Sequence, residues 1–399
     1  MADYFPYESV SKSEQQHTII PAEQLPSEEP LGALELVAHF NGAMPTGVTV
    51  SQKGRIFVNF PKWGDEVPFT VAELKDGKAV AYPNEAMNQT DTPDLGANDN
   101  ATTLVSVQSV VVDPADRLWI LDTGSPMFQP TKYGGPKLVC VDLEKNQVFK
   151  KILFPQSVAL PTTYLNDVRF DLRRGKEGIA YITDSAQNGP NGIIAVDLAS
   201  GESWRRLNDH PSTKAEALRT FLPIVEGRPF LVKQQQEQEQ EKGSQKLAAN
   251  MGSDGIAISA TGDRLYYCPL ASRKLYSVST EALSDRSVDD QYVSRTVKDE
   301  GDKGGASDGL ESDAEGHIYV TNYEHNAIMR QNPNGEWETI VHDPRLLWPD
   351  TMSLASDGYL YVTANQLHRQ ARFHDGHDMR RKPYTLFRVK VNAKPVLLR

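Results

Sequence analysis

Residues 107–124 read VQSVVVDPADRLWILDTG: a short alternating strand, a polar turn and a second strand. Alternation on both sides of such a turn is typical of a β-hairpin. The phrase occurs six times along the chain, and recurrence at this scale indicates a repeat architecture. The other copies are residues 44–60, 165–185, 252–270, 306–323 and 348–365.

A second pair of β-rich segments follows most copies, such as GPKLVCVDLEKNQVFKKILF at 135–154 and GIIAVDLASGESWRRL at 192–207. Four strands per repeat correspond to one propeller blade. A β-sandwich also has many short strands, but it does not repeat one phrase six times. The sequence therefore predicts an all-β fold, a six-bladed β-propeller.

The regions outside the repeats set the domain boundaries. We expect residues 1–30 to form an N-terminal arm and residues 31–399 a single propeller. The strand-like segment 31–40 is predicted to join the last blade beside 385–391, which would remove free sheet edges. A polar low-complexity insertion is expected at about 228–248, and residues 213–226 before it are expected to form a short helix.

The composition excludes several classes of partner. The net charge is −11, which disfavours nucleic acid and anionic membranes, and no apolar run reaches the length of a membrane helix. The N-terminus lacks the pattern of a signal peptide. We therefore expect a cytoplasmic protein in which Cys140 and Cys268 are buried free thiols. The pattern leaves the oligomeric state open.

Hairpin geometry predicts which residues face a pocket. The start of the first strand and the end of the second lie at the same face of a blade, and first strands line the channel of a propeller. The starts form a predicted ring, and the second-strand ends form a second tier. The ring is Thr46, Ser109, Asn166 with Asp167, Asp254, Asp308 and Asp350, and the tier is Asn59, Asp122 with Thr123, Asp184, Asn322 with Tyr323, and Asn365.

Two interpretations of the ring stay open. Asp at a strand start can accept backbone N–H bonds and hold a turn, which is a structural role. Alternatively the side chains converge on one ligand or on a divalent cation such as Ca²⁺. Loop residues near the same face add candidates for ligand contact, namely Lys62, Trp63, Phe128, Tyr133, His325, Trp348, His368 and Arg369. The His-rich segment 368–382 is expected to form a rim or lid.

Several long phrases resemble the yellow / major royal jelly protein family. They include MPTGVTVSQKGRIFVNFPKW at 44–63, LVSVQSVVVDPADRLWILDTG at 104–124 and WPDTMSLASDGYLYVTANQL at 348–367. The resemblance covers roughly residues 44–370. Without a signal peptide pattern, the chain is most similar to the intracellular fungal members. The fold is also similar to lactonase propellers of the gluconolactonase (senescence-marker) type.

The resemblance implies a small-molecule pocket at one end of the channel. Some fungal members act in specialised (secondary) metabolism as hetero-Diels–Alder catalysts, and this is the leading expectation. It requires no cofactor. Tyr323, His325, Thr46 and His368 are the expected hydrogen-bond donors. Trp63 and the ring and tier residues are expected to bind a small organic substrate.

Two other functions remain open: a divalent-metal lactone hydrolase and a non-catalytic binder of small ligands. By resemblance to the lactonases, Asn166, Asp254 and Asp308 match metal-binding positions. The first-blade position, however, is Thr46, where those enzymes have Glu. This departure weakens the lactonase interpretation, because the metal cage would be thinner and no obvious base would activate water.

Overall fold

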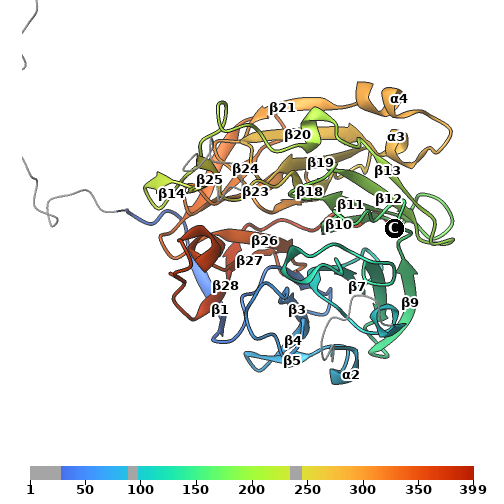
Figure 1. Cartoon of the computed structure of the whole chain (residues 1–399), viewed down its shortest axis with the longest axis horizontal. Coiled ribbons are helices and arrows are strands. Elements are labelled where there is room, and N and C mark those ends of the chain that lie inside the picture. Colours follow the sequence, from blue (N-terminus) through green and yellow to red (C-terminus); the bar gives the residue numbers. More distant parts are fainter. Residues whose placement is uncertain (1–27, 89–97, 234–244) are drawn as a thin grey trace, which may run out of the picture.

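The computed structural model describes residues 28–88, 98–233 and 245–399. Its main strands form six four-stranded antiparallel sheets that follow one another around a single axis (Figure 1). The prediction of a six-bladed β-propeller is therefore confirmed. Most of the predicted arm, residues 1–27, and the middle of the predicted insertion, residues 234–244, lie outside the described residues.

The innermost strand of each blade lines the central channel. These strands are almost wholly buried, and each contacts the inner strands of the two neighbouring blades, so that they close a ring. In chain order they are β2 (Val48–Val50), β6 (Val107–Val112), β10 (Leu165–Asp171), β18 (Ser253–Ile258), β22 (Leu310–Ser312) and β26 (Pro349–Leu354).

The remaining strands extend outward from the channel. Second and third strands are mostly buried, whereas outermost strands such as β9 alternate between exposed and buried residues. The bounds are β3 (Ile56–Asn59), β4 (Val71–Lys75) and β5 (Lys78–Ala81); β7 (Arg117–Asp122), β8 (Lys137–Asp142) and β9 (Gln147–Leu153); β11 (Ile179–Asp184), β12 (Gly192–Asp197) and β13 (Ser203–Arg206); β19 (Arg264–Pro269), β20 (Lys274–Ser279) and β21 (Lys298–Asp302); β23 (Ile318–Asn322), β24 (Ala327–Gln331) and β25 (Trp337–His342); and β27 (Tyr359–Ala364), β28 (Tyr384–Lys390) and β1 (Leu34–Phe40).

The first and last segments of the propeller close it together. Strand β1 pairs with β28, so the N-terminal segment supplies the outermost strand of the sixth blade, as predicted (Figure 1). Nearer the channel, the Thr363 hydroxyl donates to the Thr46 carbonyl at 2.6 Å, which joins the sixth blade to the first. Pairing segments 34–40 and 384–390 in one sheet joins the beginning of the propeller to its end and closes the ring of blades.

The C-terminal tail covers one end of the channel. Lys394 and Pro395 contact the Asp313–Ala314 turn of the fifth blade, and the Leu398 carbonyl accepts from Leu172 N of the third. Residues 395–397 also line a small cavity of ≈ 90 Å³ between the ends of the inner strands.

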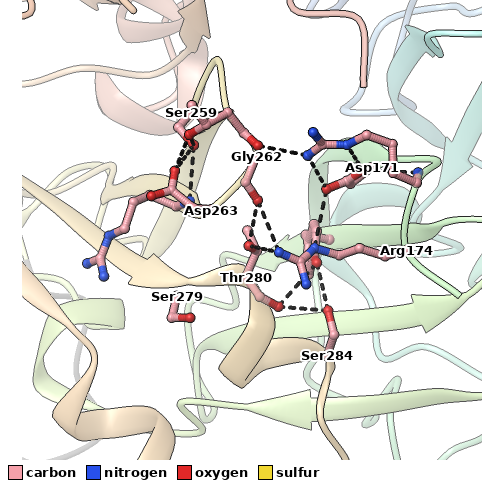
Figure 2. Close-up of polar contacts among 12 residues, drawn as sticks. Asp171, Arg174, Ser259, Gly262, Asp263, Ser279, Thr280 and Ser284 are labelled. Carbon is pink, nitrogen blue, oxygen red and sulfur yellow. Dashed lines mark hydrogen bonds and ion pairs between the residues drawn. The ribbon is translucent and has the colours of Figure 1, made fainter. Parts of the chain in front are cut away.

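Polar contacts tie neighbouring blades together at their outer parts. Figure 2 shows one such contact between the third and fourth blades. The Arg174 guanidinium donates to the Thr280 hydroxyl at 2.8 Å, and that hydroxyl donates to the Gly262 carbonyl at 2.6 Å. Asp171 holds Arg174 in place. These contacts fix the relative orientation of two blades and so the shape of the channel between them.

Helices are few and short in the described residues: α2 (Glu85–Asn88), α3 (Thr280–Ser284) and α4 (Asp290–Arg295), besides 3-10 turns. None is long and apolar enough to cross a membrane. Both cysteines are buried and free, as predicted.

The prediction of a short helix at 213–226 is wrong. The segment consists of turns and the hairpin β14 (Ile224–Val225) with β15 (Arg228–Pro229), followed by β16 (Leu231–Lys233) and β17 (Gln245–Leu247). The reason is packing: Phe221 and Val225 are both buried in an apolar cluster. Tertiary contact thus overrides helix propensity.

Candidate functional site

A repeated irregularity positions the ring residues. In the third, fourth and sixth blades the register of the inner pair shifts at the second residue of the inner strand, which is Asn166, Asp254 or Asp350. Bulges of this kind redirect a side chain at the end of a sheet. The equivalent residue of the second blade is Gln108, because its shift lies between Val107 and Ser109.

The predicted ring therefore needs two corrections, at Ser109 and at Asp167. Ser109 lies one position beyond the ring, and its hydroxyl donates to Asp167 of the next blade at 2.6 Å. Asp167 also accepts from Arg169 at 2.9 Å, so both act lower in the channel. The ring at the mouth consists of Thr46, Gln108, Asn166, Asp254, Asp308 and Asp350.

Glycine follows the ring position where two inner strands approach closely. A Cβ on Gly255 would lie 2.3 Å from the Asp308 carbonyl oxygen, and one on Gly309 would lie 2.3 Å from that of Asp350. Only glycine fits such an approach. The Asp-Gly pairs of these two blades are therefore explained by channel packing and not by turn geometry.

Asp254, Asp308 and Asp350 form an acid layer at the mouth. All three are buried, with 7% exposure at most. Burial, and next the neighbouring carboxyls of Asp308 and Asp350, raise the pKa of Asp254 well above its ordinary value. Burial and the Asp308 carboxyl do the same to the pKa of Asp350, and burial raises the pKa of Asp308 to about 6. Desolvated like charges thus favour protonated carboxyls here.

Aromatic side chains two positions before the ring bind ring members of the preceding blade. The Trp348 indole donates to Asp308 at 2.7 Å, and the Tyr164 hydroxyl donates to Gln108 Oε1 at 2.9 Å. Both aromatic residues are buried. Sequence reasoning singled out Trp348 but missed Tyr164 and Gln108, although Tyr164 occupies the same offset in its repeat. Comparing offsets between copies would have found it.

Three of the four predicted donors already have partners in the protein. The Tyr323 hydroxyl donates to the Leu270 carbonyl, and the Thr46 hydroxyl donates to the Gln108 carbonyl while accepting from Asn59. His368 is buried against Trp348 and bonds Glu226 through Nε2 at 2.7 Å. Its Nδ1 has no partner among the described residues, and burial lowers the pKa of His368, which favours the neutral ring.

The fourth predicted donor, His325, does not reach the mouth. It is exposed in the turn between β23 and β24, and its carbonyl accepts from His342 at the end of the outermost strand. The reason is geometric: the turn leads outward from the channel as soon as Tyr323 has packed on Trp348, 4.1 Å away between ring centroids.

The second tier is largely structural. Asp122 accepts from three backbone N–H groups and from buried Lys137, and Asp184 accepts from two and from Arg205. Asn322 donates to the Gly304 carbonyl. Asn365 differs, because its amide donates to Asp350 at 2.6 Å and so contacts the acid layer.

The ring does not fit a divalent cation. Asp254 and Asp308 share a hydrogen bond, and the Thr46 hydroxyl is engaged on both sides. The Asn166 amide donates to Ser185, which leaves one oxygen. Among the described residues, no three carboxylate or imidazole ligand atoms of the ring lie within 4.8 Å of one another. Calcium needs six or more oxygen ligands, so this donor set is too sparse.

One cluster of potential ligand side chains lies outside the ring, and its role is structural. Asp313 lies near Glu315 and His317, but its carboxylate accepts from their backbone N–H groups, from the His317 ring and from the Tyr319 hydroxyl. Asp113 makes the same contacts in the second blade. A device repeated between blades holds a turn and needs no ion.

An aromatic cluster packs against the acid layer. It consists of the buried side chains Tyr164, Tyr323, Trp348 and Leu367 together with Phe230. Phe230 packs edge-on against Trp348 with ring centroids 5.5 Å apart. Near this cluster, a cleft of ≈ 880 Å³ runs between the β16–β17 hairpin and residues 371–376.

The fold defines a six-bladed β-propeller that carries a buried acid layer at one end of its channel. The profile of the major royal jelly protein family matches residues 105–395, and the chain belongs to this family. Protein yellow from Drosophila pseudoobscura pseudoobscura is 28% identical over 263 residues, covering 65% of this chain and 44% of that protein. Major royal jelly protein 7 from Apis mellifera is 31% identical over 183 residues, covering 45% and 36%. The matches span less than half of these relatives.

Solved structures support the fold. The calcium-binding protein regucalcin from Agrobacterium tumefaciens superposes with a TM-score of 0.51 at 13% identity, covering 91% of this chain and 98% of that one. A putative gluconolactonase gives a TM-score of 0.52 at 11% identity, covering 91% and 99%. The distant similarity to lactonase propellers is therefore confirmed at the level of the fold.

Proposed function

We propose that this protein binds a small organic substrate at the channel mouth and catalyses a hetero-Diels–Alder cycloaddition in specialised terpenoid or polyketide-type metabolism. The acid layer carries the proposal: Asp254 and Asp350 have pKa values raised well above the ordinary carboxyl range. A carboxylic acid kept neutral in an apolar site is a strong hydrogen-bond donor. The identity of the metabolism rests on the family resemblance.

The chemistry asks little of the protein. A conjugated carbonyl and an alkene form one C–C and one C–O bond as π bonds are consumed, with no net transfer of protons or electrons. The cleft near the aromatic cluster would hold the two partners together, so that their reaction no longer requires a bimolecular encounter. A protonated Asp would donate to the carbonyl oxygen as charge develops on it. No metal, water or base takes part.

The lactone hydrolase is the weaker candidate because the ring is too sparse for a divalent cation and because Thr46 replaces the expected carboxylate. A non-catalytic small-ligand protein would use the same cleft. It would not accelerate a reaction, so an activity assay separates it from the leading proposal.

The experiment offers purified protein an unsaturated-carbonyl heterodiene with a terpene polyene, and in parallel a lactone, each with and without EDTA. We expect an enantioenriched cycloadduct that EDTA does not affect. Asp254→Asn and Asp350→Asn should each lower its rate about 100- to 1,000-fold, the usual contribution of one preorganised donor. An adduct that is racemic and no faster than background, or a lactonase activity abolished by EDTA, would overturn the proposal.

A further inference from the structure

Arg372 has an unusual set of neighbours at the cleft. It lies in the 3-10 turn Ala371–Phe373, and its Nε donates to Gln370 at 2.9 Å. Neither Nη1 nor Nη2 has a partner among the described residues. By contrast, Arg369 and Arg380 of the same segment each hold a carboxylate, Glu226 and Asp65 respectively.

Aromatic rings hold the Arg372 guanidinium in position. Its Cζ lies 4.5 Å from the Phe373 ring centroid, 4.7 Å from that of Phe128 and 5.7 Å from that of Trp63. Phe128 also stacks on Tyr164, with centroids 4.8 Å apart. Cation–π contacts of this kind orient a cation without neutralising it. The two Nη groups therefore remain available to a ligand.

The same side chain borders open space. Arg372 and Phe373 line the ≈ 880 Å³ cleft, together with Gln187. Gln187 also borders a recess of ≈ 160 Å³ that Phe128 and Tyr164 line. Its volume is within the range of small-molecule sites.

Arg372 is exposed at the cleft, and among the described residues no carboxylate pairs with its guanidinium. The guanidinium is protonated at neutral pH, so it places a positive charge at the cleft. An anionic ligand group would form charge-assisted hydrogen bonds with the free Nη atoms.

We propose that Arg372 binds the anionic group, a carboxylate or an enolate, of a planar conjugated ligand that lies in the cleft beside Phe373. The inference rests on the proposed function and names the ligand class, a planar conjugated molecule with one anionic end. It makes Arg372 a determinant of specificity.

Calorimetry with matched probes tests the inference: 2-naphthoate, its neutral methyl ester and the cationic 2-naphthylmethylamine. We expect wild-type protein to bind naphthoate at least tenfold more tightly than the ester and to bind the amine most weakly. Arg372→Gln should lose about tenfold on naphthoate and almost nothing on the ester. Arg372→Lys should keep part of the preference, because it retains charge but not the bidentate fork.

The control is Arg388→Gln, which removes an arginine that stacks on Tyr359 in the sixth blade, outside the residues that line the cleft. It should bind naphthoate like wild type. Should Arg372→Gln fail to fold, as judged by its thermal melt, the naphthoate-to-ester ratio of Arg372→Lys decides instead.

Equal affinity of wild type for naphthoate and ester would overturn the inference alone and leave the acid-layer proposal standing. So would tighter binding of the amine. Binding of none of the probes would overturn the inference together with the proposed pocket. If Arg372→Gln forms the cycloadduct of a neutral substrate at the wild-type rate, the acid-layer proposal stands independently of the Arg372 inference.

Discussion

Asp308 shares one hydrogen bond with Asp254 and accepts another from the Trp348 indole. These contacts place the titratable Asp308 carboxyl beside the buried Trp348 side chain, away from bulk water. The buried acid layer links the protonation state of single residues to the stability of the folded protein, so pH measurements test the site without a substrate.

A first prediction concerns that linkage. The pKa of Asp308 is about 6 in the folded protein, against an ordinary value near 4 in the unfolded chain. Its contribution to stability is present below pH 4 and is lost as pH rises through 6. Relative to Asp308→Asn, wild type should lose roughly 3 kcal/mol in free energy of unfolding between pH 4 and pH 8.

Urea unfolding at stepped pH measures this difference. The matched control is Asp76→Asn, which changes an exposed aspartate in the turn between β4 and β5. This variant should follow the wild-type pH profile throughout. Parallel profiles for wild type and Asp308→Asn would show that the carboxyl is ionised at its ordinary pKa.

At the scale of elements, the strand β1 joins the sixth blade and reaches the first. Phe40 of β1 is buried and packs against Phe60 with ring centroids 5.6 Å apart. Phe40→Ala should therefore cost about 3–5 kcal/mol in chemical unfolding. Leu36→Ala, on the same strand but 52% exposed, should cost under about 0.5 kcal/mol. Equal costs would mean that β1 does not close the propeller.

A second element-scale prediction concerns the insertion. Glu226 binds Arg369 and His368, and these hydrogen bonds, Arg369 first, lower the pKa of Glu226. Glu226→Gln should weaken this attachment and raise amide exchange across β14–β16 by about tenfold while leaving the blades unchanged. Arg219→Gln, an exposed change in the segment that precedes the hairpin, is the control. Unaltered exchange in Glu226→Gln would show that packing of Phe230 alone holds the insertion.

Local patterns made the strands and blade order predictable, because each hairpin repeats within one blade. The site was less accessible from the sequence. Ser109 was placed one residue away from the true ring position, because a bulge shifts the register and only pairing across the blade reveals it. Glu226 belongs to the β14–β15 hairpin and Arg372 to the loop that follows β27, and these segments meet only in three dimensions. The helix expected at 213–226 failed for the same reason.

At the scale of the whole molecule, the two ends of the channel differ. The C-terminal tail covers the far end, where Leu398 is buried in the core between the third and fourth blades. The near end carries the acid layer and the aromatic cluster, with the cleft close by. The ring positions and the loops of the near end therefore carry the proposed function.

The central claim is that carboxyls at the mouth are protonated at neutral pH and donate to a bound carbonyl. Infrared difference spectroscopy at pH 7 tests it directly, comparing wild type with Asp254→Asn and Asp350→Asn. The account predicts a protonated-carboxyl C=O band in wild type that weakens in each variant, shifts when a carbonyl ligand binds and is unchanged by Ca²⁺. A spectrum without that band, or a band that Ca²⁺ removes, would contradict it.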